Sequence, residues 1–476
     1  MLEQSFSYFN QMGARQGAGA VYLNVLHPDF ELLMDTKKIN ADEKIRLATL
    51  SIGAMIPDVF MKLAEKNQKG YAFYPHSVYK KHGVHLDEID MNEWYDILAN
   101  DKDVRKKEID PRKILTRIAQ TQQESGYPYV VFLDTANKDH TLKGIGKIKM
   151  SNLCCEIFQY QKPSDIKGYG LDNNWGQDIS CNLGSLNIAN VMDNKDIVGT
   201  VEASIRALTY VSDNTNILEV PTVKNGNDNS HAVGLGAMNL HGYLVREGIS
   251  YTSETAREFA SVFFAMIRFY AIRASMSLSF EKGKSFEGFE NSEYAKGIES
   301  DVLRKYYETD FTPKSDRVKE LFEGIYVPTK EDWKLLLDTV KVTGLYNAYL
   351  MAIAPTQSIS YVQNATSSIM PITEPIETRT YGNSTTIYPM PFLTNYNIFL
   401  YQSAYRMDMM DVIDMVSVIQ PHVDQGISTT LFVTDDKTTR DIARYYIYAY
   451  QKGLKSLYYT RTKMTRQDTE CVMCAV

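Results

Sequence analysis

The 476-residue chain lacks the features that mark exported, membrane-spanning and nucleic-acid-binding proteins. It has 51 basic and 58 acidic residues, a net charge of −7 and no long basic run, which argues against a nucleic-acid-binding surface. No uninterrupted apolar run approaches the roughly 18 residues that a membrane span needs. The first residues, MLEQSFSYFNQMG, lack the basic and then apolar layout of a signal peptide. These absences predict a cytoplasmic protein that binds neither a membrane nor a nucleic acid.

Cysteine is also scarce, and the five residues are Cys154, Cys155, Cys181, Cys471 and Cys474. An odd number, gathered at two places in a chain without an export signal, argues against a framework of structural disulfides. The pattern favours reduced thiols that take part in chemistry.

The rest of the composition is that of a globular protein, with 44% hydrophobic and 23% charged residues. Strand-like and helix-like patterns alternate and predict an α/β fold, a parallel or mixed sheet with helices outside. The expected strands are 20–25, 71–74, 129–133, 178–186, 233–235, 349–354, 428–433 and 456–460. The expected helices are 1–18, 29–38, 41–67, 91–100, 111–125, 198–217, 237–246, 255–281, 330–342, 408–419 and 438–451. Residues 283–327, rich in Gly, Ser, Glu and Lys, are expected to form a surface insertion.

The segment Ser151-Asn152-Leu153-Cys154-Cys155-Glu156-Ile157 places an amide, two thiols and a carboxylate within five positions. In an extended segment alternate side chains share a face, so Asn152, Cys154 and Glu156 would point one way and Cys155 the other. That face would present a hydrogen-bonding amide, a thiol and a base side by side. The alternative is a loop whose two cysteines behave as small buried hydrophobic residues.

The chain ends in Cys471-Val-Met-Cys474-Ala-Val476 after a polar tail. A Cys-x-x-Cys pair is typical of a dithiol/disulfide couple or of half a zinc site. None of the eight histidines lies near it in sequence, and only two residues follow it. We therefore favour a mobile dithiol that carries electrons, with a zinc site or an incidental pair as alternatives.

Three further places carry candidate functional residues. Tyr458 and Tyr459 are adjacent in the last expected strand, where tyrosines usually serve packing. Residues 354–360 follow an apolar strand and are expected to begin a helix. The free N–H groups and hydroxyls at this helix start could bind an anion. The alternative is an ordinary helix cap that follows a proline turn and binds nothing. Cys181 lies on an expected strand, where a cysteine is usually inert, although a second thiol near Cys154 would suit redox chemistry.

Taken together, the motifs SNLCCE, DISCNLGSLN, GLGAMNLHGYL, APTQSISYV, ETRTYGNS, SLYYTRT and the terminal CxxC closely resemble the large (α) subunit of class I ribonucleotide reductase, most nearly the class Ib form. They occur in register from about Gln16 to Val476, so the resemblance covers nearly the whole chain. It implies a partial ten-stranded α/β barrel over residues 1–460, with a finger loop at about 148–160 inserted into it. A flexible redox tail would follow over residues 461–476.

The resemblance also implies roles for the residues around the finger loop. Cys154 would form the transient thiyl radical that takes the 3′ hydrogen from the ribose of a ribonucleoside diphosphate. Glu156 would be the base for the 3′ hydroxyl, and Asn152 its hydrogen-bonding partner. Cys181 would be one thiol of the pair that delivers electrons as the 2′ hydroxyl leaves as water. Cys155, which faces away, is not expected to carry the radical.

The remaining candidates resemble relay and binding residues of the family. Tyr458 and Tyr459 would be a stacked pair that relays the radical from a small subunit, and Cys471 and Cys474 a shuttle to a thioredoxin or glutaredoxin-like reductant. The substrate phosphates would bind the loop Pro355, Thr356, Gln357, Ser358 and Ile359. The family usually has Gly in place of Gln357, and Gly relaxes φ limits that Gln obeys, so the conformation of this loop does not follow from the resemblance. The chain itself is expected to need no metal or other cofactor, and a radical-generating dimetal centre would lie in the small subunit.

One expected residue is absent, because the family's other reducing cysteine lies upstream of the finger loop and no cysteine precedes Cys154 here. The first barrel strands and the effector-reading loops are also missing. We therefore expect the C-terminal part of a split ribonucleoside-diphosphate reductase large subunit, completed by an N-terminal large-subunit polypeptide. The alternatives are a non-catalytic remnant that binds the small subunit or a nucleotide, and a zinc or thiol-redox module that uses the terminal cysteines.

Overall fold

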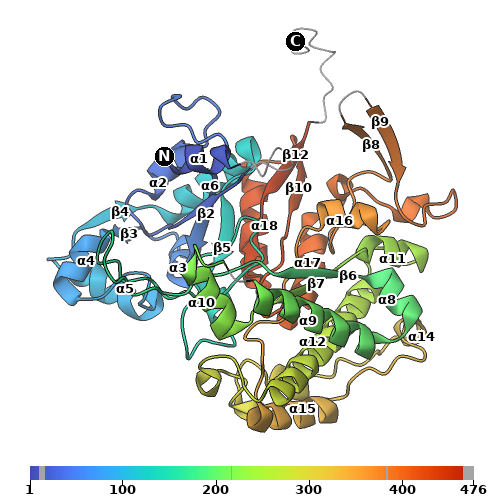
Figure 1. The fold of residues 1–476 in the computed structure, drawn as a ribbon. Helices are drawn as coiled ribbons and strands as arrows, with labels where there is room; N and C mark the ends of the chain where they lie inside the picture. Colours follow the sequence, from blue (N-terminus) through green and yellow to red (C-terminus); the bar gives the residue numbers. More distant parts are fainter. Residues whose placement is uncertain (10–16, 216, 382–383, 465–476) are drawn as a thin grey trace.

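The computed structural model describes residues 1–9, 17–215, 217–381 and 384–464 (Figure 1). The α/β class expected from the sequence is confirmed, because helices surround a set of mostly parallel strands. In Figure 1 the helices α9, α12 and α15 gather at the bottom of the view, and the β8–β9 hairpin projects at the upper right.

The helices follow one another along the whole described chain. In chain order they are α1 (Leu2–Tyr8), α2 (Phe30–Asp35), α3 (Asp58–Glu65), α4 (Pro75–His82), α5 (Met91–Asn100), α6 (Pro111–Ser125), α7 (Leu133–Lys138), α8 (Ile188–Asn194), α9 (Ile197–Asn214), α10 (Pro221–Ser230), α11 (Leu240–Arg246), α12 (Glu254–Lys282), α13 (Lys305–Glu308), α14 (Asp316–Leu321), α15 (Lys330–Thr343), α16 (Gln357–Val362), α17 (Met409–Ile419) and α18 (Thr439–Gln451). Short 3₁₀ helices are η2 (Phe289–Asn291), η3 (Gly297–Glu299), η4 (Ile398–Leu400), η5 (Ala404–Arg406) and η6 (Gln420–His422).

The strands form one four-stranded sheet and several pairs. They are β1 (Ala20–Asn24), β2 (Ser51–Ile56), β3 (Gly70–Phe73), β4 (Lys106–Ile109), β5 (Tyr129–Phe132), β6 (Leu183–Asn187), β7 (Gly234–Met238), β8 (Ile376–Tyr381), β9 (Ser384–Pro389), β10 (Leu431–Thr434), β11 (Ser456–Leu457) and β12 (Thr460–Lys463). The four-stranded sheet has the order β1-β2-β5-β11, in which β1, β2 and β5 are parallel and β11 is antiparallel to β5. The pairs β6–β7 and β10–β12 are parallel, and β3–β4 and β8–β9 are antiparallel.

Backbone hydrogen bonds outside the regular ladders connect these sheets. Residues 349–353 bond to β7 through Leu235 N and Leu350 O, 2.8 Å apart, and pair with the segment before β10 at Ile353 and Ile427. Tyr458 N donates to Thr429 O at 2.7 Å, which joins that segment to the end of β11. The result is a continuous series of extended segments from β6 to β1, and in the described residues its two ends do not pair with each other.

Helix α6 shows how the local sequence positions the site. The Asp110 side chain caps the helix by accepting from Lys113 N. Pro111 lies in the first turn, where a backbone N–H would have no partner within the helix, so its missing N–H costs no hydrogen bond. Gly126 ends the helix with a left-handed φ of 80°. The chain then turns at once into β5, whose first residue, Tyr129, lies beside the candidate site.

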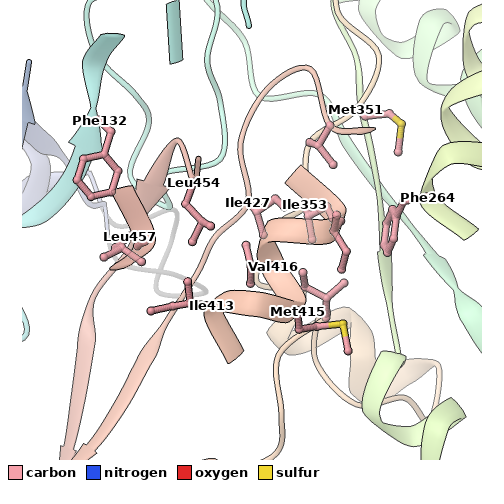
Figure 2. Packing of buried hydrophobic residues seen from close by; sticks show 14 of the residues in the cluster. Phe132, Phe264, Met351, Ile353, Ile413, Met415, Val416, Ile427, Leu454 and Leu457 are labelled. Carbon is pink, nitrogen blue, oxygen red and sulfur yellow. The ribbon is translucent and has the colours of Figure 1, made fainter. Parts of the chain in front are cut away.

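The core forms where α12 and α17 pack against the strands. Figure 2 shows Met415 and Val416 of α17, Phe264 of α12 and the extended-segment residues Ile353 and Ile427, which belong to one buried cluster. Helix α12 is long and apolar enough to cross a membrane by length and composition, although arginines interrupt it, but 83% of its most apolar 18-residue window is buried in the fold. Its apolar surface is therefore accounted for by packing, as in the core helix of a large protein.

Three expectations about the fold are wrong, in addition to those at the site described below. Residues 51–56, expected within a helix, form the fully buried strand β2, because parallel pairing on both sides outweighs local helix preference. Residues 283–327 are no surface insertion, since Phe286, Tyr294 and Tyr306 belong to the main core. The tail does not begin at residue 461, because Thr460–Lys463 pairs with β10.

Candidate active site

The segment around Cys154 is a turn and not the expected extended strand. Cys155 N donates to Asn152 O at 3.3 Å, and Cys155 has a left-handed φ of 65°. The Asn152 side-chain oxygen accepts from Glu156 N at 3.1 Å and from Ile157 N at 3.2 Å, which closes the turn. This turn, and not strand alternation, brings Asn152 and Glu156 together. We call residues 152–156 the Cys154 turn.

The Glu156 carboxylate is buried, with 1% of the residue exposed. Burial raises the pKa of the Glu156 carboxyl above its usual value, and hydrogen bonds with Asn152 and Ser428 counter part of that shift. Ser428 Oγ lies 3.1 Å from Glu156 Oε2 and donates to Cys154 O at 2.7 Å. Ser428 therefore connects the carboxylate to the cysteine backbone, a role that the sequence did not predict.

Cys181 lies next to the same turn. It precedes β6, which begins at Leu183 and not at residue 178 as expected, and Asn152 Nδ2 lies 3.7 Å from Cys181 Sγ. The side chain is exposed, yet burial of its sulfur among neighbouring groups, and then the Glu156 charge, raise the pKa of the thiol to about 11. The group is accordingly a protonated thiol at neutral pH and can give up a proton.

Tyr458 and Tyr459 occupy the break between β11 and β12. Their ring centroids are 4.4 Å apart at an interplanar angle of 75°, so the rings meet edge to face. The sequence had predicted a stacked pair. Tyr458 Oη lies 3.9 Å from Cys154 Sγ, and its ring lies 4.8 Å from that of Tyr129. Burial, followed by the nearby Cys154, raises the pKa of Tyr458 far above the usual range. The phenol therefore holds its proton beside the thiol.

A cavity of ≈ 310 Å³ adjoins Ser428, Tyr458 and Tyr459, whereas Asn152, Cys154, Glu156 and Cys181 are not among its lining residues. Its lining includes Pro355, Gln357, Ser428, Tyr458 and Arg461. The cavity therefore extends from the expected phosphate-binding loop to the hydroxyl that bonds the Cys154 turn. Arg461, expected in the tail, contributes a positive charge to the lining.

The loop before and within α16 holds the residues that the sequence singled out for phosphate binding. Gln357 is the first residue of α16, and the left-handed conformation falls on Thr356, at φ 53°. Position 357 therefore does not need the freedom of Gly. Ser368 N donates to Thr356 Oγ1 at 2.7 Å, while Ser358 and Ile359 are exposed and do not line the cavity.

The remaining expected site residues, Cys471 and Cys474, lie outside the described residues. Within the described part of the chain, no group of three or more His, Cys, Asp or Glu side chains is placed to hold a metal ion. Sequence reasoning missed Ser428, Arg461 and Tyr129. Of these, only Arg461 had a local signal, because it adjoins the tyrosine pair.

The sequence matches a family model and several curated proteins. The model "Ribonucleotide reductase, barrel domain" matches residues 1–460. The ribonucleoside-diphosphate reductase subunit alpha of Bacillus subtilis (strain 168) is 51% identical over 476 residues, which are 100% of this chain and 67% of that protein. The subunit of the same name from Mycoplasma pneumoniae is 42% identical over 491 residues, 100% of this chain and 68% of the relative. The Treponema pallidum subunit is 29% identical over 484 residues, 98% of this chain and 54% of the relative.

Proposed function

Because the chain belongs to the ribonucleotide reductase family and spans about two thirds of its relatives, we propose that it supplies the reaction centre of a ribonucleoside-diphosphate reductase. The reaction reduces ribonucleoside diphosphates to deoxyribonucleoside diphosphates for DNA synthesis. The observation that carries the proposal is a set of linked contacts beside one cavity: Tyr458 contacts Cys154, Ser428 connects Cys154 to Glu156, and Asn152 lies against Cys181. Tyr458 and Ser428 line that cavity.

The radical would reach the substrate through the tyrosine pair. Tyr459, at the outer end, would pass the oxidising equivalent to Tyr458 across rings in edge contact. Tyr458, as a phenoxyl radical, would then take the hydrogen atom of the Cys154 thiol, which leaves a phenol and a thiyl radical. The separation of 3.9 Å between the two atoms supports this transfer. A radical-generating dimetal centre in a small subunit would supply the oxidising equivalent.

The Cys154 thiyl would remove the hydrogen atom from C3′ of the ribose and become a thiol again. Glu156 would accept the proton of the 3′ hydroxyl while Asn152 holds the carboxylate by a hydrogen bond. The 2′ hydroxyl would leave as water with a proton from Cys181, whose raised pKa keeps that proton bound until it is needed. Two electrons and the second proton would come from Cys181 and a second thiol, which together become a disulfide. Cys154 would then return its hydrogen atom to C3′ and become a thiyl again, and Glu156 would return its proton to the 3′ oxygen.

The substrate would occupy the 310 Å³ cavity with its diphosphate toward the loop of Pro355, Thr356, Gln357, Ser358 and Ile359. The backbone N–H groups at the start of α16 and the Arg461 guanidinium in the cavity lining support binding of an anion. Ser428, which also lines the cavity, bonds the Cys154 turn and so marks the place where the sugar would lie.

The complete reaction needs partners besides the substrate. The second reducing thiol would come from an N-terminal large-subunit polypeptide, since Cys155 is fully buried on the other side of the turn. That polypeptide would also cover the edges of β1 and β6, which are unpaired among the described strands. The tail thiols Cys471 and Cys474 would carry electrons from a thioredoxin or glutaredoxin-like protein. We expect the assembled enzyme in the cytoplasm, where such reductants keep thiols reduced.

Reconstitution of this chain with an N-terminal large-subunit polypeptide, a small subunit and a dithiol reductant tests the proposal. We expect deoxyribonucleoside diphosphate to form, and Cys154→Ser and Tyr458→Phe each to lower turnover by about 10³-fold or more while substrate binding persists. Tyr326→Phe, which removes an exposed phenol remote from the cavity, is the matched control and should retain activity. Turnover that is unaffected by Cys154→Ser would favour a non-catalytic remnant.

A further inference from the structure

The backbone carbonyls of the Cys154 turn are held by donors from different parts of the fold. Tyr22 Oη on β1 donates to Asn152 O at 2.6 Å. Ser428 Oγ donates to Cys154 O at 2.7 Å, and Ser456 Oγ on β11 donates to Cys155 O at 2.9 Å. Gly426 N donates to Glu156 O at 2.8 Å. The turn is therefore fixed from several sides by groups that are distant in the sequence.

Among these donors, Tyr22 depends on a neighbouring residue for the space that its ring occupies. It pairs directly with Gly53 in the parallel β1–β2 ladder, and a Cβ on Gly53 would lie 2.3 Å from the Tyr22 ring. The missing side chain at Gly53 thus makes room for the ring to lie across β2. From there Tyr22 Oη reaches both Asn152 O and, at 3.6 Å, Cys155 Sγ.

The turn needs such support because its backbone is strained. Cys155 has a left-handed φ of 65°, which is unfavourable for a residue with a side chain. A buried carbonyl that loses its donor also has a desolvation cost, so the turn would relax where a donor is removed. A relaxed turn would move the Cys154 sulfur relative to Tyr458 Oη.

We propose that Tyr22 and Ser456 are positioning residues that hold the Cys154 turn in the conformation in which Cys154 faces Tyr458. The part of this proposal that concerns turnover rests on the proposed function. The part that concerns the turn itself does not. Hydrogen-atom transfer requires close approach of donor and acceptor, so a small displacement of the sulfur lowers the rate without changing how the substrate binds.

The turn can be tested in the chain alone by thiol labelling. N-ethylmaleimide labelling resolved by peptide mass spectrometry reports each cysteine separately, and the rate at Cys155 in each variant is compared with the rate at Cys155 in the wild type. We expect Tyr22→Phe and Ser456→Ala each to speed labelling of buried Cys155 about tenfold. Loss of one buried hydrogen bond should raise the equilibrium constant for local opening of the turn by about this factor. The control is Tyr306→Phe, which removes a buried phenol that donates to Pro421 O at 3.2 Å, away from the turn. Equal Cys155 labelling in all four proteins would overturn the proposal.

Turnover in the reconstituted enzyme tests the same residues at the reaction. We expect Tyr22→Phe to lower kcat by about 10- to 100-fold with KM for the ribonucleoside diphosphate unchanged. Ser456→Ala should act in the same direction. Wild-type kcat in both variants would overturn the positioning role. If the wild-type assembly itself is inactive, the proposed function fails, while the labelling result still decides whether the turn is held as we infer.

Discussion

At the scale of single residues, Glu156 and Ser428 determine how the reaction should depend on pH. Glu156 has a raised pKa because it is buried, and a base must be ionised to accept a proton. We therefore expect kcat to fall as the pH is lowered toward the pKa of Glu156. Because that pKa is raised, the fall should begin at a higher pH than it would for an ordinary glutamate carboxyl. Ser428→Ala removes a hydroxyl that hydrogen-bonds the carboxylate and should raise the pKa of Glu156 further, which shifts this acid limb to higher pH.

The measurement is a pH profile of kcat for the wild type and the variant. Ser417→Ala is the matched control, since the Ser417 hydroxyl bonds only to Asp414 O of its own helix, at 2.8 Å. An acid limb at the same pH in all three proteins would contradict the assignment of Glu156 as the base. A shift in the control alone would mean that the profile reports stability and not the ionisation of Glu156.

The residue types of the site could be read from the sequence, but their geometry could not. The spacing of Asn152, Cys154 and Glu156 suggested a shared face of an extended segment, whereas the structure joins Asn152 and Glu156 through a turn with Cys155 at positive φ. Ser428 lies 272 positions from Glu156, and no local pattern marks it as the hydroxyl that contacts the carboxylate. Contacts of this range depend on strand register, which periodicity does not give.

At the scale of elements, long helices were predicted more closely than strands. The expected helices 255–281 and 330–342 agree with α12 and α15 to within one residue at each end, because both have long helical patterns with caps. Strand β2 was missed, since Ser51–Ile56 is buried on both faces and shows no alternation that would mark a strand. The pair β1–β2 that holds Tyr22 was therefore not predictable as a pair.

The β1–β2 pair leads to a test of how these two strands fit together. Gly53→Ala places a Cβ against the Tyr22 ring, and overpacking of this kind should lower the free energy of unfolding by about 1–3 kcal/mol. Urea unfolding of the chain measures the change. In a Tyr22→Ala background the same substitution should cost less, because the ring that it meets is gone. Equal costs in both backgrounds would mean that the ring does not lie against Gly53.

At the scale of the whole molecule, one buried ion pair connects the central helix to the strands around the site. Arg268 of α12 and Asp424 lie 2.9 Å apart, with 2% and 1% of their side chains exposed. The Asp424 carboxylate also accepts from Leu350 N at 2.9 Å and Met351 N at 2.8 Å, and Lys455 Nζ donates to Asp424 O at 2.7 Å. Asp424 thus connects α12, residues 349–353 and the residue that precedes β11. It also lies two residues before Gly426, whose N–H group bonds the Cys154 turn.

Removal of this carboxylate should loosen the scaffold and the site together. Asp424→Asn leaves the Arg268 charge buried without its partner, and we expect the free energy of unfolding to fall by about 3–5 kcal/mol. The control is Glu108→Gln, which breaks the exposed Lys69–Glu108 pair, 69% and 58% exposed, and should cost at most about 1 kcal/mol. Urea unfolding compares the two. Replacing both members, as Arg268→Met with Asp424→Asn, should recover part of the loss, because the Arg268 charge is then no longer buried without its partner. Equal costs for Asp424→Asn and Glu108→Gln would mean that the buried pair does not hold α12 to the strands.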